Sequence, residues 1–361
     1  MIKHEPINLL TIKGFKSILN LDQFELRDLN ILIGANGSGK SNFISFFNML
    51  GELVEGRLQL WTSLQGSADR LVSFGVKETS LLQSTLKSGQ WQYRFSLKPT
   101  IDGSFTFLKE LFTLAEGDVD LQTSTGPGIK ESELKDFDLS GGWYPRLASI
   151  RVYHFHDTSD TAGVKRRLSL HDNEYLRSDA SNLAAFLYRM KNQSPEVYQQ
   201  IRKTVSLALP FFDDFVLKPE ELTTEEKLIR LLWRQQGSDY TLWPSQLSDG
   251  AIRFICLVTA LLQPEPPSTI IIDEPELGLH PYAITLLASL LRSSSKRMQV
   301  IVSTQSVPLV NQFSIDDLVI VERENGASVF KRHSEAEFET WLEEYSVGEL
   351  WEKNVLGGRP L

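Results

Sequence analysis

A glycine-rich stretch directly after an apolar run constrains the fold of this chain more than any other feature. The run covers residues 30–33 and leads into Gly34-Ala35-Asn36-Gly37-Ser38-Gly39-Lys40-Ser41. This order matches G-x-x-x-x-G-K-[ST], the phosphate-binding loop, in its required place between a buried strand and a helix. A chance glycine-rich turn would rarely reproduce both the full pattern and its setting. The sequence therefore predicts a nucleotide-binding protein.

The residue types of the loop follow from phosphate chemistry. Glycines let successive backbone N–H groups point at phosphate oxygens, which a Cβ would obstruct. Lys40 brings a mobile positive charge to the β- and γ-phosphates, and the Ser41 hydroxyl is placed to ligate Mg²⁺. The helix after the loop offers its positive N-terminus to the same anion. The residues expected to contact the nucleotide are Asn36, Gly37, Ser38, Gly39, Lys40, Ser41 and Asn42.

Composition narrows the classes of protein that the loop can serve. The chain has 361 residues, enough for one core with an inserted lobe. No apolar stretch approaches the roughly 20 residues of a membrane-spanning helix, and the N-terminus lacks the apolar core of a secretion signal. The single cysteine, Cys256, cannot form an internal disulfide, so we expect a cytoplasmic protein. A net charge of −9 does not favour a nucleic-acid coat, although 165–167 and 296–297 are short basic runs.

Alternating β and α segments predict an α/β fold with a parallel core sheet, an antiparallel β layer and an inserted helical lobe. The expected strands are 7–12, 24–26, 29–33, 91–97, 104–108, 149–155, 211–217, 228–235, 269–272, 299–303 and 317–322. The expected helices are 42–50, 179–191, 195–207, 248–262 and 281–294. The turn Asp102-Gly103 predicts a hairpin, and the Gly-, Ser- and Thr-rich stretch 115–145 predicts a long loop or lid.

Near the C-terminus, a run of acidic residues predicts the solvent-exposed face of a helix. Its buried face would carry Phe338, Trp341, Leu342 and Tyr345. Packing of this side within the chain is favoured over docking of a partner protein.

The second chemical feature is Thr269-Ile270-Ile271-Ile272-Asp273-Glu274-Pro275, a buried strand that ends in two acids. Asp273 would hold Mg²⁺ alongside Ser41. Glu274, on the other side of the strand end, can polarise a water for attack on the γ-phosphorus. A turn that merely ends a strand is the alternative, and the phosphate loop makes it the weaker interpretation.

The third feature is Leu247-Ser248-Asp249-Gly250-Ala251, about 20 residues before the apolar strand. Ser248 reads first as the N-cap of the helix 248–262. Together with the two acids, this L-S-x-G helix start resembles the ATP-binding-cassette ATPases, and specifically their SMC and RecF branch. The resemblance implies that Ser248 and the Gly250 amide of one subunit cap the ATP held by the other. It thus implies a homodimer that sandwiches two ATP molecules.

Further segments fit the same branch. Residues 10–17 resemble the entry turn that lies near the adenine in RecF- and SMC-type heads, which implies nucleotide contacts by Phe15 and Lys16. Residues 276–281 resemble the segment that crosses the dimer interface. Gln305 follows the strand expected at 299–303, in the place where the family carries its switch histidine. The amide of Gln305 can donate a hydrogen bond to a γ-phosphate but cannot transfer a proton. We therefore expect slow ATP turnover. The glutamine that usually contacts Mg²⁺ has no clear counterpart, Gln65 and Gln83 being the nearest options.

The chain also resembles small bacterial predicted ATPases related to RecF and OLD heads, through 153–159, 178–184, Trp341-Leu342 and 357–360. Within 153–159, His154, His156 and Asp157 suggest a metal site, but without further ligands in view, packing or a contact near the γ-phosphate is the favoured interpretation.

The expected divisions are 1–115 and 211–330 for the two parts of the head, 116–210 for an inserted lobe and 331–361 for a helical extension.

An ATP-gated, slowly hydrolysing dimeric switch is the leading functional hypothesis, with DNA as an expected target by analogy with repair or phage defence. Roughly 200 residues separate Lys40 from Leu247 without a heptad pattern, which predicts a compact lobe in place of SMC arms. The alternatives are the energising subunit of a membrane transporter, itself without membrane insertion, and a regulatory ATPase of a separate nuclease or effector. The sequence L-S-D-G, the Phe15-Lys16 entry and Gln305 disfavour the transporter.

Overall fold

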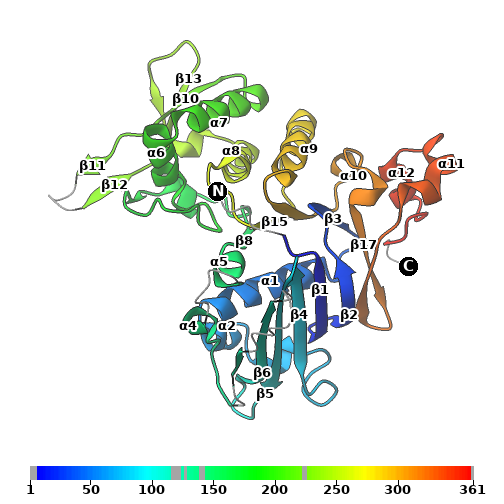
Figure 1. Ribbon diagram of the computed structural model, residues 1–361. Coiled ribbons are helices and arrows are strands. Elements are labelled where there is room, and N and C mark those ends of the chain that lie inside the picture. Colours follow the sequence, from blue (N-terminus) through cyan, green and yellow to red (C-terminus); the bar gives the residue numbers. More distant parts are fainter. Residues whose placement is uncertain (1–5, 115–122, 126–127, 138–142, 222–225, 359–361) are drawn as a thin grey trace. The chain divides into compact units, whose positions relative to one another are not determined.

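The computed structural model describes residues 6–114, 123–125, 128–137, 143–221 and 226–358. The chain forms two compact units (Figure 1). Unit 1 comprises Met1–Val152, Pro267–Ile271 and Met298–Leu361, and unit 2 comprises Tyr153–Pro266 and Ile272–Arg297. The four-part division expected from the sequence stays a prediction.

A six-stranded sheet carries the phosphate loop. Its strand order is β18-β17-β3-β16-β15-β8. The strands are β3 (Leu29–Ile33), β8 (Arg151–Tyr153), β15 (Thr269–Asp273), β16 (Gln299–Ser303), β17 (Leu318–Glu324) and β18 (Ala327–Lys331). β3 pairs in parallel with β16 and β17, while β18 pairs antiparallel with β17. Every residue of β3 and β16 is buried, because strands covered on both faces need continuous apolar runs.

An antiparallel sheet forms the second layer of unit 1, in the order β2-β1-β4-β5-β6-β7. Its strands are β1 (Leu9–Phe15), β2 (Ile18–Glu25), β4 (Leu82–Ser88), β5 (Trp91–Pro99), β6 (Phe105–Leu114) and β7 (Thr123–Thr125). The hairpin at Asp102-Gly103 is confirmed, with Gly103 at φ +80°. The apolar faces of these strands pack on helix α1 (Lys40–Val54) through its phenylalanines Phe43, Phe46 and Phe47.

Helices dominate unit 2. They are α6 (Leu183–Gln193), α7 (Pro195–Ala208), α8 (Asp249–Leu262) and α9 (Pro281–Ser295), of which α8 packs on both α7 and α9. Two small sheets complete it, β10-β13-β14 and β11-β12-β9. Their strands are β9 (Leu168–Ser169), β10 (Phe212–Val216), β11 (Glu220–Glu221), β12 (Lys227–Ile229), β13 (Leu232–Gln235) and β14 (Thr241–Leu242).

Two expectations about local structure differ from the structure, and one strand was not expected. The strand expected at 228–235 is divided between β12 and β13, which belong to different sheets. Within 115–145, the described parts hold β7 and the short helices α4 (Leu134–Phe137) and α5 (Trp143–Ala148); residues 115–122, 126–127 and 138–142 lie outside the description. β4 was not expected, because polar Ser and Thr residues interrupt its alternating pattern.

The expected C-terminal helix is also wrong. A single 3₁₀ turn at Glu335–Phe338 is followed by the one-turn helix α11 (Glu339–Leu342), and neither has a buried residue. Trp341, expected on the buried face of that helix, is 47% exposed. The remaining helices are α2 (Leu58–Leu64), α3 (Ala68–Leu71), α10 (Val307–Val310) and α12 (Val347–Glu352).

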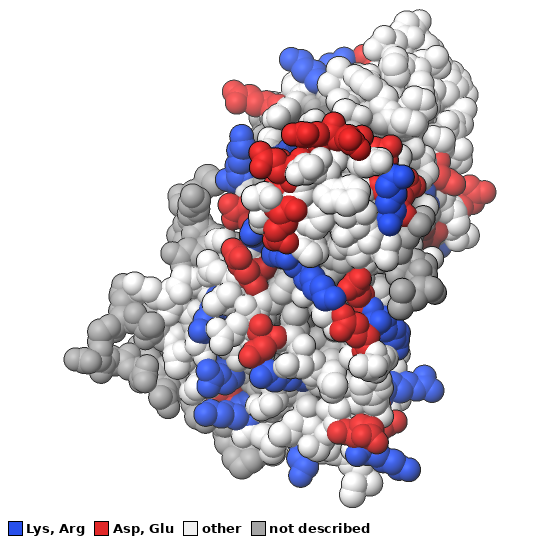
Figure 2. All heavy atoms as spheres, turned by 90° about the vertical axis from the view of Figure 1, so that its right-hand side faces the viewer, with Lys and Arg blue, Asp and Glu red and all other residues white. Residues whose placement is uncertain are grey.

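Charges of both signs share the surface. On the face drawn in Figure 2, lysines and arginines alternate with acidic residues, and neither sign covers a broad area alone. Among the described residues, no helix is long and apolar enough to cross a membrane.

Candidate nucleotide-binding site

The phosphate loop turns sharply between β3 and α1 at glycines that no other residue could replace. Gly34 has φ +153° and Gly39 has φ +119°, a region that L side chains rarely adopt. A Cβ on Gly34 would overlap with the Val321 carbonyl oxygen, and one on Gly39 would overlap with the Ser328 hydroxyl. Gly37, at φ +78°, faces open space instead. The backbone therefore packs tightly at both ends of the loop and stays open at its middle.

Two polar side chains of the loop are buried inside it. The Lys40 ammonium donates to the carbonyl oxygens of Gly34 at 2.6 Å and Ala35 at 3.0 Å, which holds it in the loop's concavity. The Ser38 hydroxyl is buried and has no hydrogen-bond partner in the described part of the chain. Such a buried, unpaired hydroxyl is costly unless a ligand satisfies it. Together with the exposed Ser41, these groups fit a bound polyphosphate.

A chain of hydrogen bonds supports the loop from distant parts of the sequence. The side-chain amide of Asn42 donates to the Ser17 hydroxyl at 2.6 Å. The hydroxyls of Ser17 and Ser328 share a hydrogen bond of 2.6 Å, and the Ser328 hydroxyl donates to the Ser38 carbonyl oxygen at 2.6 Å. From near the C-terminus, the Gly358 carbonyl oxygen accepts a 2.7 Å bond from the Ala35 amide. The sequence did not reveal these hydrogen bonds, because Ser328 belongs to no motif and lies more than three hundred positions after Ser17.

The entry turn corrects one predicted contact. Phe15 is fully buried, with its ring at 5.7 Å from that of Phe46, so it cannot stack on a base in this conformation. Lys16 is half-buried, and its ammonium donates to the Ser45 hydroxyl on α1 at 2.6 Å. Burial lowers the pKa of Lys16. Of the two residues, only Lys16 remains a candidate for contact with a nucleotide.

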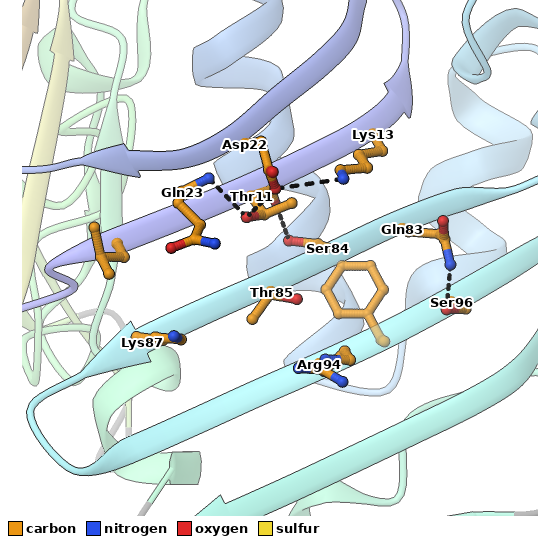
Figure 3. A pocket seen from close by; sticks show the side chains of 12 residues that line it. Thr11, Lys13, Asp22, Gln23, Gln83, Ser84, Thr85, Lys87, Arg94 and Ser96 are labelled. Atoms are coloured by element: carbon orange, nitrogen blue, oxygen red, sulfur yellow. Dashed lines mark hydrogen bonds and ion pairs between the residues drawn. The ribbon is translucent and has the colours of Figure 1, made fainter.

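The two glutamines suggested for Mg²⁺ contact lie at the end of α2 and on β4. Gln65 ends α2 as its C-cap. Gln83 lies on β4 and donates to the Ser96 hydroxyl at 3.3 Å, on the outer face of the antiparallel sheet. It lines a polar hollow of about 280 Å³ there, which also contains the ion pair of Lys13 with Asp22 (Figure 3). This hollow contains no cluster of catalytic groups.

Gln305, the residue in the place of the switch histidine, follows the buried strand β16. The Thr304 amide before it donates to the Leu32 carbonyl oxygen on β3 at 3.0 Å. This bond fixes the backbone at Gln305 against the strand that enters the phosphate loop.

In unit 2, the L-S-x-G sequence forms the start of α8, as expected. The Ser248 hydroxyl caps the helix by accepting from the Ala251 amide at 3.2 Å. A Cβ on Gly250 would overlap with the Gly278 carbonyl oxygen, so this position requires glycine for packing alone. Ser248 and Asp249 are exposed, although nearly all of α8 beyond them is buried.

Arg253 on α8 ties the helix to two neighbouring segments. Its guanidinium donates to the carbonyl oxygens of Phe155 at 3.1 Å, His156 at 3.0 Å and Leu277 at 2.9 Å. A planar fork of N–H donors suits this kind of multiple backbone contact. The start of α8, the segment after β8 and the segment after Glu274 are thereby held together within unit 2.

The two acids stand at the end of β15. Asp273 is its last residue, and Glu274 has the left-handed backbone conformation at φ +42°. This conformation is strained for a residue with a side chain, and such strain concentrates at functional sites. The buried Pro275 follows directly and fixes the turn.

His154 and His156 lie next to Asp273. One ligand atom of each of the three residues lies within 4.8 Å of the others, the sole such group of three among the described residues. Burial lowers the pKa of His154, with Asp273 opposing that shift. Asp157, the third ligand suggested by the sequence, is exposed and accepts from the Ser159 amide at 3.0 Å. The acid that completes the group thus comes from β15, more than a hundred positions later, which the local spacing could not reveal.

Comparisons with known proteins agree with this geometry. Residues 29–311 match the family described as "AAA domain, putative AbiEii toxin, Type IV TA system". The chain belongs to this family. The matched range contains the phosphate loop, the L-S-x-G helix start and the two acids that end β15. No curated protein matches the chain.

Solved structures show the same fold. The chain is similar to an SMC head bound to the C-winged helix domain of ScpA, with 16% identity and a TM-score of 0.62, over 92% of this chain and 99% of that one. An Smc head domain with an extended coiled coil, bound to the C-terminal domain of ScpA derived from Pyrococcus furiosus, gives 15% identity and a TM-score of 0.58 over 94% and 99%. These likenesses confirm the expected P-loop α/β fold.

The packing at Gly250 leads to a stability prediction. Gly250→Ala should lower the free energy of unfolding by about 1–3 kcal/mol, because the added methyl overlaps with the Gly278 carbonyl oxygen. Gly51→Ala, in the interior of α1 with no atom near the added Cβ, is the matched control and should raise it by up to about 1 kcal/mol. Urea denaturation of both variants measures the difference. Equal or greater stability of Gly250→Ala than of wild type would show that α8 does not need this close approach.

Proposed function

We propose that this protein is an ATP-hydrolysing switch in which two copies close around two ATP molecules. The observation that carries the proposal is the start of α8. This helix is buried over most of its length, yet its N-terminus is exposed at Ser248 and Asp249. A helix N-terminus attracts anions. In the proposal, its anion is the γ-phosphate bound at the phosphate loop of a second copy.

Each motif has one role in the proposed reaction. The loop amides and Lys40 bind the phosphates, and Ser38 supplies a hydroxyl that is otherwise unpaired. Ser41 and Asp273 are the residues that would hold Mg²⁺, which when bound neutralises charge on the phosphates. Glu274 orients and deprotonates the attacking water. The strained backbone at Glu274 supports this role, since it fixes where the carboxylate points.

Turnover is proposed to be slow because of Gln305. A glutamine amide can donate to a γ-phosphate oxygen, but it cannot accept and pass on a proton as imidazole does. The closed state would then persist long enough to act as a signal. Hydrolysis would serve to end that signal.

The dimer prediction uses Glu274→Gln. This change removes the base and keeps the shape of the side chain, so ATP should accumulate in the closed dimer. With Mg²⁺ and ATP, size-exclusion chromatography coupled to light scattering should show mainly dimer for Glu274→Gln and less for wild type. Lys40→Ala, combined with Glu274→Gln, is the matched control and should stay monomeric. The proposal is falsified if Glu274→Gln dimerises no more than wild type in ATP.

DNA is the proposed target of the closed dimer, supported by the likeness to SMC heads alone. Neither the net charge of −9 nor the mixed surface in Figure 2 adds to it. Duplex DNA should therefore bind the Glu274→Gln variant more tightly with ATP than without it, and the affinity should fall as salt rises. Fluorescence anisotropy over a salt series measures this. A negligible affinity that ATP does not change would remove DNA from the account.

Regulation of a separate effector protein is the second candidate function. Its supporting observation is the segment Glu335–Leu342, where Trp341 is exposed and no side chain is buried. Aromatic residues that stand exposed in this way are enriched at protein interfaces. The two SMC heads named above each bind a ScpA domain, which shows that heads of this fold can carry a partner.

A further inference from the structure

We infer that unit 2 carries a binding site for a divalent transition-metal ion, formed by His154, His156 and Asp273. All three residues belong to unit 2, and their ligand atoms lie within 4.8 Å of one another. The inference does not depend on ATP binding, because neither the phosphate loop nor a nucleotide contributes a ligand.

The backbone after β8 presents the two histidines on one side. Buried and partly exposed residues alternate here: Tyr153 and Phe155 are buried, while His154 and His156 are half-buried. The rings of Tyr153 and Phe155 pack together at 5.2 Å on the other side. The histidine rings are 6.3 Å apart and tilted by 32°.

The segment is held rigidly in this position. Arg253 binds the carbonyl oxygens of Phe155 and His156, and the His154 amide donates to the Ser178 carbonyl oxygen at 2.9 Å. On the other side, Asp273 is fixed by the end of β15 and by the turn at Glu274-Pro275. Ligands held by such contacts lose little freedom when a metal binds.

Space for a small ligand is present beside the cluster. A hollow of about 10 Å³ is lined by His156, Asp273 and Glu274, with Arg253 and apolar side chains around it. This volume accommodates about one water-sized sphere, which suits a single ion or its bound water. Ligands on one tetrahedral zinc ion lie about 3.3 Å apart, so modest side-chain rotation would bring the three atoms into range.

The donor set selects the class of metal. Imidazole nitrogen suits Zn²⁺, Co²⁺, Ni²⁺ and Fe²⁺, and two imidazoles with one carboxylate leave coordination positions open for water. Mg²⁺ prefers oxygen ligands in octahedral geometry and is poorly served by imidazole. The site should therefore distinguish transition metals from Mg²⁺.

Co²⁺ is the most direct probe, because its visible absorption reports nitrogen ligands. In nucleotide-free solution, wild type should bind one Co²⁺ per chain, Zn²⁺ should displace it, and equimolar Mg²⁺ should not. His154→Asn and His156→Asn should each weaken Co²⁺ binding about tenfold or more, since one ligand of three is lost. His171→Ala removes an exposed histidine of the same unit and should bind like wild type.

Thermal unfolding gives a second readout that also checks folding. Zn²⁺ should raise the unfolding midpoint of wild type and of Lys40→Ala, but not of the two asparagine variants. Retained binding in Lys40→Ala would show that the ion binds without an intact phosphate loop. Absence of Co²⁺ binding by wild type, equal binding by the asparagine variants, or displacement by equimolar Mg²⁺ would each overturn the inference.

Discussion

Close approach of the backbone to neighbouring atoms at a few glycines is the constraint on which the rest of the structure depends. At Gly34 the chain leaves β3 in contact with the Val321 carbonyl oxygen, and at Gly39 it enters α1 against Ser328. Between these two ends, Gly37 faces open space. Gly250 repeats the principle in unit 2, where it lets the start of α8 rest on Gly278. The bends of the phosphate loop and the placement of the start of α8 thus depend on the same property, the absence of a Cβ.

Supports from remote sequence then hold these backbone segments in place. Ser17 and Ser328 connect the phosphate loop to both sheets of unit 1, and Arg253 connects α8 to the segments after β8 and after Glu274. The side chains of Ser328 and Arg253 donate to backbone carbonyl oxygens, and the Ser17 hydroxyl bonds to that of Ser328. A hydrogen bond is stronger in the protein interior than in water, so buried bonds of this kind hold the backbone more firmly than exposed ones. Asp273 stands among the residues that they organise, with proposed roles toward Mg²⁺ and toward a transition metal.

The sequence predicted what local patterns determine. The bounds of β3, β16 and α8 follow from continuous apolar runs and a serine cap, and the loop follows from its motif. What depends on long-range packing was not predictable. The resemblance implied a nucleotide contact for Phe15, but its side chain is buried against Phe46 of α1. His154 and His156 have no acidic partner nearby in sequence; Asp273 joins them only because β8 and β15 are neighbours in the sheet. Residues 335–345 have helical spacing of apolar residues, yet none of these side chains is fully buried and Trp341 is 47% exposed.

The central claim is that a nucleotide bound at Lys40 of one copy meets Ser248 of another, and mixing two inactive variants tests it most directly. Lys40→Ala disables the phosphate loop, and Ser248→Arg blocks the start of α8. If the sites are shared, equal mixing yields heterodimers with one intact site each, and ATPase activity should recover to about a quarter of the wild-type rate for independent sites. If each chain binds and hydrolyses ATP alone, the mixture will stay as inactive as its components, and the account of a shared site will be contradicted.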